Sequence, residues 1–104
     1  MDSKTFHILL VLAGGPLHGY AIRREVEERT GGSLKLWPAT LYGALRELTE
    51  SGWIEEVAGA ATEEDPRRRT FGLTPHGRRA LAAEAGRLEE LARLARGKLA
   101  EGPA

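Results

Sequence analysis

The sequence predicts a mostly α-helical protein with a small β-hairpin and a long helix at its C-terminal end. Apolar residues recur three or four positions apart in four segments, which is the period of an amphipathic helix. Glycine- and proline-containing stretches separate these segments, as expected of helix ends and turns. Two short apolar stretches flank a small, polar loop, which is typical of a hairpin. The length of 104 residues suits one domain of ordinary size.

The first two helices are predicted on either side of a glycine-rich turn. Phe6, Leu9 and Leu10 recur at helical spacing, and the Gly-Gly-Pro of residues 14–16 then ends the first helix. The second helix is expected over about residues 18–30, because apolar side chains four positions apart face its inner side and two glycines close it.

A third helix is predicted from Pro38 to about Ser51, since proline suits the first position of a helix. Its core stripe consists of leucines spaced i, i+4 and i+7, namely Leu41, Leu45 and Leu48. The sequences WIEEV (53–57) and RRTFGL (68–73) predict two short strands, and the Pro-terminated segment between them predicts the hairpin loop.

The last helix is predicted to begin at Pro75, after the capping residue Thr74. It carries an apolar seam with alternating spacings of four and three and a neighbouring leucine, which comprises Leu81, Ala85, Leu88, Leu91, Ala92, Ala95 and Leu99. A seam of about three heptads is longer than a small domain needs for its own core, so we expect homodimerisation through this helix. The alternative is that the seam packs on the chain's own core.

The order of helix, helix, helix, strand, loop, strand and long helix is that of the winged helix-turn-helix, in which the third helix enters the major groove of DNA. Residues 1–74 would form this DNA-binding domain, and residues 75–104 the C-terminal dimerisation helix and tail. The outer face of the third helix is small at its start and then offers a hydroxyl, a phenol and a guanidinium. The candidate DNA contacts on this face are Ala39, Thr40, Tyr42, Gly43 and Arg46. These groups suit phosphates and base edges, although a solvated face with an accidental glycine is the alternative.

A run of arginines follows the predicted hairpin loop. The chain is neutral overall, with 15 basic and 15 acidic residues, yet no acidic residue occurs between Pro66 and Ala83. Arg67, Arg68 and Arg69 stand where a wing would contact phosphate, and at least one of them is expected to do so. Strand alternation prevents all three from pointing the same way, and the acidic residues just before them weaken the case for the wing tip.

The turn GGPLHGYAI leads into the second helix, whose first backbone N–H groups are expected to be free to bind a DNA phosphate. Here His18 is interpreted as a helix cap or a phosphate neighbour rather than a metal ligand. Tyr20 is expected to pack between helices with its hydroxyl reaching outward. Both are therefore candidate DNA contacts that position the protein without reading sequence.

Catalysis and metal binding are not expected from this composition. The chain has no cysteine, and its three histidines lack the spacing of metal ligands. We therefore expect no enzyme activity, no metal and no cofactor. The apolar run FHILLVLA is too short for a signal peptide or a membrane-spanning helix, so a cytoplasmic protein without a membrane partner is predicted.

Trp37 and Trp53 are the only two tryptophans. Each is expected to be an ordinary core or boundary aromatic. The alternative is a pocket at the dimer interface in which a flat, hydrophobic effector stacks between them.

The segments GPLHGYAI, PATLYGALREL, SGWIEE and RRRTFGLTPHGRRAL, in this order, resemble the PadR family of bacterial transcriptional regulators. The resemblance covers about residues 8–81 and implies a winged-helix homodimer of the compact branch with one C-terminal helix, typically a repressor released by a small aromatic or hydrophobic effector. Thr40 and Tyr42 match the family's TLY, and Arg68 and Arg69 match its basic strand. Thr70, Phe71 and Gly72 replace the family's usual aromatic pair and basic residue, so a phenol is absent there.

The leading hypothesis is a sequence-specific, homodimeric DNA-binding regulator, a repressor acting on a palindromic operator in double-stranded DNA and released by a small hydrophobic effector. The alternative is a winged-helix protein–protein interaction module that does not bind DNA. Salt dependence separates the two, because DNA affinity falls steeply as salt rises.

Overall fold

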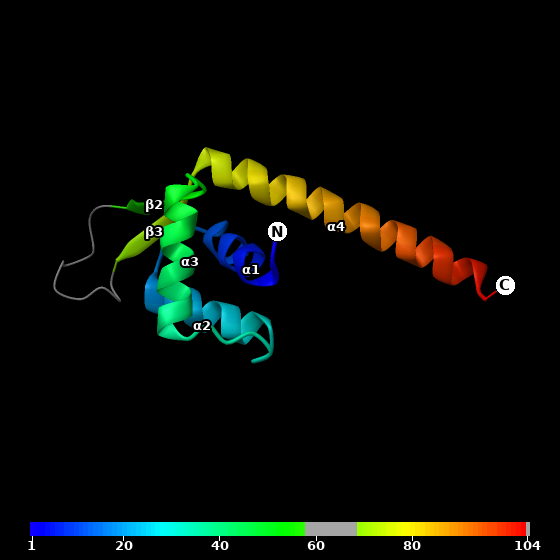
Figure 1. The fold of residues 1–104 in the computed structure, drawn as a ribbon, viewed down its shortest axis with the longest axis horizontal. Coiled ribbons are helices and arrows are strands. Elements are labelled where there is room, and N and C mark those ends of the chain that lie inside the picture. The colour runs from blue at the N-terminus through cyan, green and yellow to red at the C-terminus, as the bar shows by residue number, and fades with distance from the viewer. Residues whose placement is uncertain (58–68, 104) are drawn as a thin grey trace.

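The computed structural model describes residues 1–57 and 69–103. The elements in chain order are α1 (Ser3–Leu12), β1 (Leu17–His18), α2 (Gly19–Arg29), α3 (Pro38–Glu50), β2 (Ile54–Val57), β3 (Thr70–Leu73) and α4 (Pro75–Glu101). Figure 1 shows the three short helices and the sheet gathered around one end of the long α4. The predicted fold class, mostly α with a small β element and a long C-terminal helix, is confirmed.

Three helices begin where a side chain caps the first free N–H groups. The Asp2 carboxylate accepts a hydrogen bond from the Thr5 N–H at 2.7 Å, and this bond lowers the pKa of Asp2. His18 caps α2, and Thr74 caps α4. A cap at each start satisfies a donor that the helix itself cannot pair. The starts of α2 and α4 could be predicted to within one or two residues for this reason.

The sheet contains three strands rather than the predicted two-stranded hairpin. Its order is β1-β3-β2, and both neighbouring pairs are antiparallel. In the register, Leu17 lies opposite Phe71 on one side of β3, and Glu56 lies opposite Phe71 on the other. The two-residue β1 is too short to show any alternation, so periodicity gave no sign of it.

The core lies where α1, α2, α3 and the sheet meet. The predicted stripes supply it, because Leu41, Leu45 and Leu48 of α3 are all buried. The fully buried large side chains are Ile8, Leu9, Leu12, Ile22, Val26, Leu36, Leu41, Leu45 and Ile54. Leu10, which the spacing placed on the inner face of α1, is instead 38% exposed, because the buried stripe runs along its neighbours.

The start of α4 is fixed to the end of α3 by a compact junction. The Thr74 hydroxyl donates to the Gly52 carbonyl at 2.6 Å and accepts from the Gly77 N–H at 3.0 Å. The Thr74 N–H donates to the Trp53 carbonyl at 3.1 Å. Gly77 is buried, and a Cβ there would overlap the carbonyl oxygen of Trp53. The junction therefore determines the direction in which α4 leaves the body.

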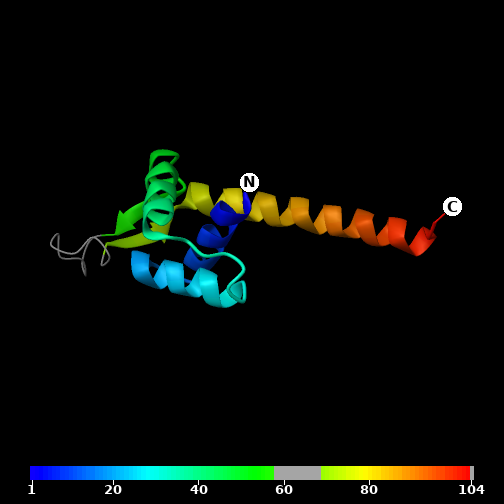
Figure 2. The same cartoon turned by 60° about the horizontal axis from the view of Figure 1, so that its bottom comes forward.

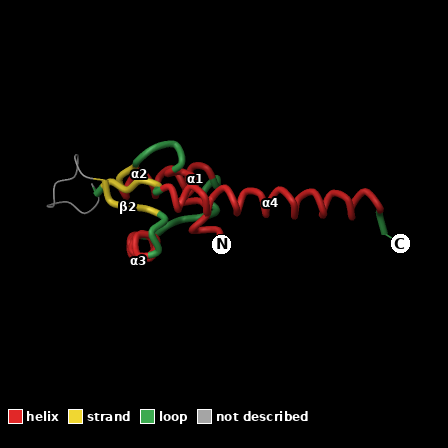
Figure 3. The backbone as a smooth tube through the Cα atoms, turned by 90° about the horizontal axis from the view of Figure 1, so that it is seen from above, coloured by secondary structure: helices red, strands yellow, loops and turns green. Residues whose placement is uncertain are grey.

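Beyond this junction α4 packs first against α1 and then extends away from the body (Figure 2). It runs crosswise to α3, which is seen nearly end-on in Figure 3. The molecule is consequently elongated, with principal extents of 62 × 28 × 20 Å. None of the described helices combines the length and the apolar character needed to cross a membrane.

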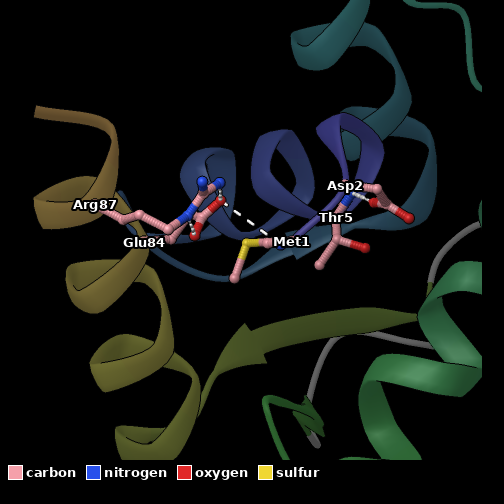
Figure 4. A network of polar contacts seen from close by, with 5 residues as sticks. All are labelled: Met1, Asp2, Thr5, Glu84 and Arg87. Carbon is pink, nitrogen blue, oxygen red and sulfur yellow. Dashed lines mark hydrogen bonds and ion pairs between the residues drawn. The ribbon is translucent and has the colours of Figure 1, made fainter. Parts of the chain in front are cut away.

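A polar network joins α4 to the start of the chain (Figure 4). Glu84 is buried, and its carboxylate accepts two hydrogen bonds from Arg87 at 2.8 and 2.6 Å. The amino group of Met1 lies 3.7 Å from the same carboxylate. The Arg87 hydrogen bonds lower the pKa of Glu84, so the carboxylate stays ionised at the α1–α4 contact.

Candidate nucleic-acid interface

The start of α3 presents an exposed face that its own chain does not cover. Ala39, Thr40 and Arg46 are exposed, as predicted for groups that reach a partner. Gly43 is half-buried, and a Cβ built there would meet no atom within 4 Å. Among the residues that the structure describes, none therefore requires glycine at this position, and the room it leaves lies on the outer face.

Tyr42 connects the helices instead of standing free. It is half-buried against the core, with its ring against the first residue of α2. A Cβ on Gly19 would lie 3.1 Å from the Tyr42 hydroxyl oxygen and 3.3 Å from its Cε1. Gly19 thus makes room for the phenol, and the Tyr42 hydroxyl lies at the N-terminal end of α2.

The predicted cap by His18 is confirmed. Its Nδ1 accepts a hydrogen bond from the Ala21 N–H at 3.1 Å, so the imidazole has a structural role at the start of α2. The Gly19 N–H donates to the Arg69 carbonyl at 3.2 Å. The expectation of free N–H groups is therefore wrong for two of them, because one binds the cap and the other binds the sheet.

The expectation that Tyr20 packs between helices is wrong. Its side chain is 52% exposed and stacks on His18, with ring centroids 6.4 Å apart and planes 22° apart. The guanidinium carbon of Arg24 lies over the Tyr20 ring, 5.8 Å from the ring centroid. One turn of helix separates Tyr20 from Arg24, so their i, i+4 spacing in the sequence already favours this contact.

The two tryptophans have opposite environments. Trp53 is a boundary aromatic packed against the core, with the edge of His76 at a centroid distance of 6.3 Å. Trp37 is 61% exposed, which contradicts the expected core or boundary role, and Arg23 lies over its ring at 5.8 Å. The residues stand at opposite ends of α3, so one chain does not bring them into a common pocket. A pocket formed by a dimer stays a prediction.

Arg69 is paired across the sheet. Its Nε and Nη2 atoms donate to the two carboxylate oxygens of Glu56 at 2.8 and 2.6 Å. This pairing lowers the pKa of Glu56 and raises that of Arg69. The absence of acidic residues between Pro66 and Ala83 suggests uncompensated arginines, which is wrong for Arg69 because strand register brings an acid from β2 beside it. Arg67 and Arg68 lie outside the described residues.

A shallow hollow of about 210 Å³ separates α3 from β3. Tyr42, Arg46 and Arg69 line it together with Glu50 and the edge of the core. Two guanidinium groups, one from the helix and one from the wing strand, therefore face the same space. The carboxylate of Glu50, at the end of α3, partly offsets their positive charge.

An exposed third helix, supported by a capped second helix and a three-stranded sheet, defines a winged helix-turn-helix protein. Within that class the chain belongs to the transcriptional regulator PadR-like family, whose family model matches residues 8–83. The resemblance inferred from the sequence is thereby confirmed.

Solved structures share the fold over most of the chain. A PadR family transcription regulator from Clostridium difficile has a TM-score of 0.77 at 22% identity, covering 94% of this chain and 99% of that chain. RosR from H. salinarum has a TM-score of 0.67 at 25% identity and covers 97% and 96%. Bacillus subtilis PadR in complex with operator DNA has a TM-score of 0.66 at 25% identity and covers 81% and 47%.

One curated relative is similar in sequence. It is the uncharacterized 37.1 kDa protein in transposon TN4556 of Streptomyces fradiae, which is 42% identical over 84 residues. The match covers 81% of this chain but 22% of the relative. The chain therefore spans about a fifth of that protein's length.

Proposed function

We propose that this chain is a homodimeric, sequence-specific DNA-binding repressor that acts on a palindromic operator. The observation that carries the proposal is the exposed start of α3, where small residues precede Thr40 and Arg46. A helix with this profile fits the major groove, because small side chains allow close approach and the polar groups then reach bases and phosphates. The solved complex of Bacillus subtilis PadR with operator DNA supports it by similarity.

The second element of the proposal is the fixed start of α2. His18 and Tyr20 are exposed beside the N-terminal end of α2, and the Tyr42 hydroxyl lies at the same place. Contacts from such groups to phosphate position a protein on the duplex without reading the sequence. Of the wing arginines, Arg69 can bind a phosphate only if the phosphate competes with Glu56 for its N–H donors. We therefore expect Arg69 to contribute less to DNA affinity than Arg46.

The third element is a dimer formed through α4. Leu88, Leu91, Leu94 and Leu99 are 40%, 48%, 50% and 79% exposed. An apolar row of this length on an extended helix favours a second copy, because a two-fold dimer buries it and matches two half-sites. Ala85 and Ala92 are half-buried beside this row and would lie within the interface.

The effector belongs to the dimer as well. Within one chain Trp37 and Trp53 lie at opposite ends of α3, so a flat hydrophobic compound would bind between side chains of two protomers. Tryptophan fluorescence titrated with planar aromatic compounds tests this part, and an unchanged signal across a broad panel would remove it while leaving DNA binding untouched.

A gel-shift titration against duplexes from upstream of the chain's own gene tests the function. The wild-type protein should bind one duplex in preference to a scrambled duplex, and Arg46→Ala should weaken that preference by about 1–3 kcal/mol if the guanidinium reads a base edge. Arg29→Ala, an exposed arginine at the far end of α2, serves as the control. Absence of binding even at low salt would instead favour a protein-interaction module.

A further inference from the structure

Two aromatic–arginine pairs lie side by side on the outer surface of the helix-turn-helix. The guanidinium of Arg24 lies over the Tyr20 ring within α2, and that of Arg23 lies over the Trp37 ring at the start of α3, each with its guanidinium carbon 5.8 Å from the ring centroid. A surface hollow of about 180 Å³ lined by Tyr20, Arg23, Arg24 and Glu27 connects the two pairs. We call the two pairs, Tyr20 with Arg24 and Trp37 with Arg23, the aromatic–arginine surface.

Trp37 is unusual for its position. It is the N-cap of α3, where its side chain makes no capping hydrogen bond. A serine or aspartate there would stabilise the helix by about 1 kcal/mol. The indole is also 61% exposed, so it adds little to the core. Neither property helps the fold, which indicates that the ring serves a contact outside the chain.

The chemistry of the surface favours a chain of phosphodiester groups. A cation–π contact uses none of the five N–H donors of a guanidinium as a conventional hydrogen bond, so these donors remain available to phosphate oxygens. A ring beneath the group also restrains a flexible side chain before any ligand arrives. Glu27 and Glu28 line hollows beside Arg24, and Lys35 lies 4.0 Å from Glu27. Together with Arg23, the three basic side chains outnumber these two acidic ones. Restrained guanidiniums and an indole N–H donor suit phosphate oxygens.

The placement of the surface relates it to the groove. Gly19 of α2 contacts Tyr42, and Arg23, one turn further along, contacts Trp37. The first turns of α2 therefore run beside the first half of α3. A helix inserted in a major groove brings whatever flanks it to the groove's rim, where the sugar–phosphate backbone lies.

We propose that the aromatic–arginine surface binds the DNA backbone at the rim of the groove that α3 enters. The proposal rests on the proposed DNA-binding function and extends it to Arg23, Arg24 and Trp37, which the sequence motifs did not indicate as DNA contacts. Arg24 and Arg23 each bind a phosphate, Tyr20 and Trp37 hold them in position, and Trp37 adds its own N–H donor.

The test measures affinity for a mixed-sequence duplex by fluorescence anisotropy across a series of salt concentrations. Arg24→Ala should weaken binding and reduce the slope of log affinity against log salt by about one per bound protomer. The loss should be the same on a second duplex of unrelated sequence, because phosphate contacts are independent of sequence. Arg29→Ala, an exposed arginine on the same helix, should leave the slope unchanged.

Trp37→Ser gives an independent result. The serine supplies the missing cap, so the variant should unfold at a higher temperature than the wild type and yet bind the duplex more weakly. A purely structural role for Trp37 would not produce these opposite effects. Unchanged affinity and slope in both Arg24→Ala and Trp37→Ser would overturn the assignment, whereas a wild-type protein that fails to bind the duplex at low salt would overturn the proposed function itself.

Discussion

The two halves of α4 belong to one continuous helix but have different surroundings. In the first half, Gly77 is buried under Trp53, Leu81 packs against the core and Glu84 is buried and paired with Arg87. In the second half, Leu91 and Leu99 are 48% and 79% exposed. The apolar seam continues through both halves with the same spacing, so its pattern does not distinguish them.

The difference teaches what each kind of sequence signal can determine. Periodicity indicates which side of a helix is apolar, but not which surface covers it. The glycine and threonine at the junction carry information of another kind, because they permit one close approach and one hydrogen-bonded direction. The chain itself therefore positions the first half of α4, whereas the leucines of the second half stay exposed.

The largest expected effect comes from a substitution that fills the space at the junction between α3 and α4. Gly77→Ala places a methyl group in the space of the Trp53 carbonyl oxygen, which forces the start of α4 away from the body. Overpacking of a buried site costs up to about 3 kcal/mol, and we expect a loss near this upper end. Chemical denaturation measures it. A variant as stable as the wild type would show that the junction yields easily and that α4 is not positioned by it.

The second effect concerns the exposed half. Leu91→Glu puts a charge in the proposed dimer seam, and burying one leucine contributes about 1.5–3 kcal/mol. Only the exposed 48% of each Leu91 is left to bury and two-fold symmetry counts it twice, so the dimer dissociation constant should rise by at least about tenfold. Sedimentation equilibrium measures this, with Ala100→Glu as a control that adds the same charge on the side of the helix opposite Leu91. A wild-type monomer, or equal effects of both variants, would contradict the proposed seam.

The third effect is a pH dependence of the first half. The Arg87 hydrogen bonds lower the pKa of Glu84 below its ordinary value of 4.5 in the folded state. The stabilisation is therefore complete above pH 4.5 and is lost as the pH falls through the lower folded-state pKa. Glu84→Gln should lower the free energy of unfolding at neutral pH and make its acid decline shallower. Glu89→Gln, exposed on the same helix, should preserve the wild-type decline.

Much of the fold could be predicted because its signals are local. The helix ends follow from Pro38, from Thr74 before Pro75 and from the capping role of His18. The third strand could not be predicted in this way, because β1 has two residues and exists only by pairing with β3. Its formation depends on tertiary contact, and a two-residue segment carries no period.

The candidate site divides along the same line. The exposed face of α3 could be predicted from helical periodicity, because its leucines all fall on one side of the helix and leave the opposite side to solvent. The Arg69–Glu56 pair needs strand register, and the Arg23–Trp37 pair needs two elements to be brought together. The Tyr20–Arg24 pair was accessible from its i, i+4 spacing alone. The contacts that could not be predicted are therefore those that join different helices and strands, because residue type alone does not show which elements meet.

The smallest effect separates the two halves most sharply. Gly86 and Gly97 both lie inside α4, and a Cβ at either position would meet no atom within 4 Å. Alanine in place of an exposed helical glycine adds about 1 kcal/mol to helix stability. Gly86→Ala should therefore raise the free energy of unfolding by about this amount, because its half of α4 unfolds with the body. In a dilute monomer Gly97→Ala should raise helicity with little change in global unfolding, since its half is not packed on the body. At concentrations where the dimer forms, the two substitutions should stabilise equally, and equal effects at every concentration would show that α4 behaves as one unit without a partner.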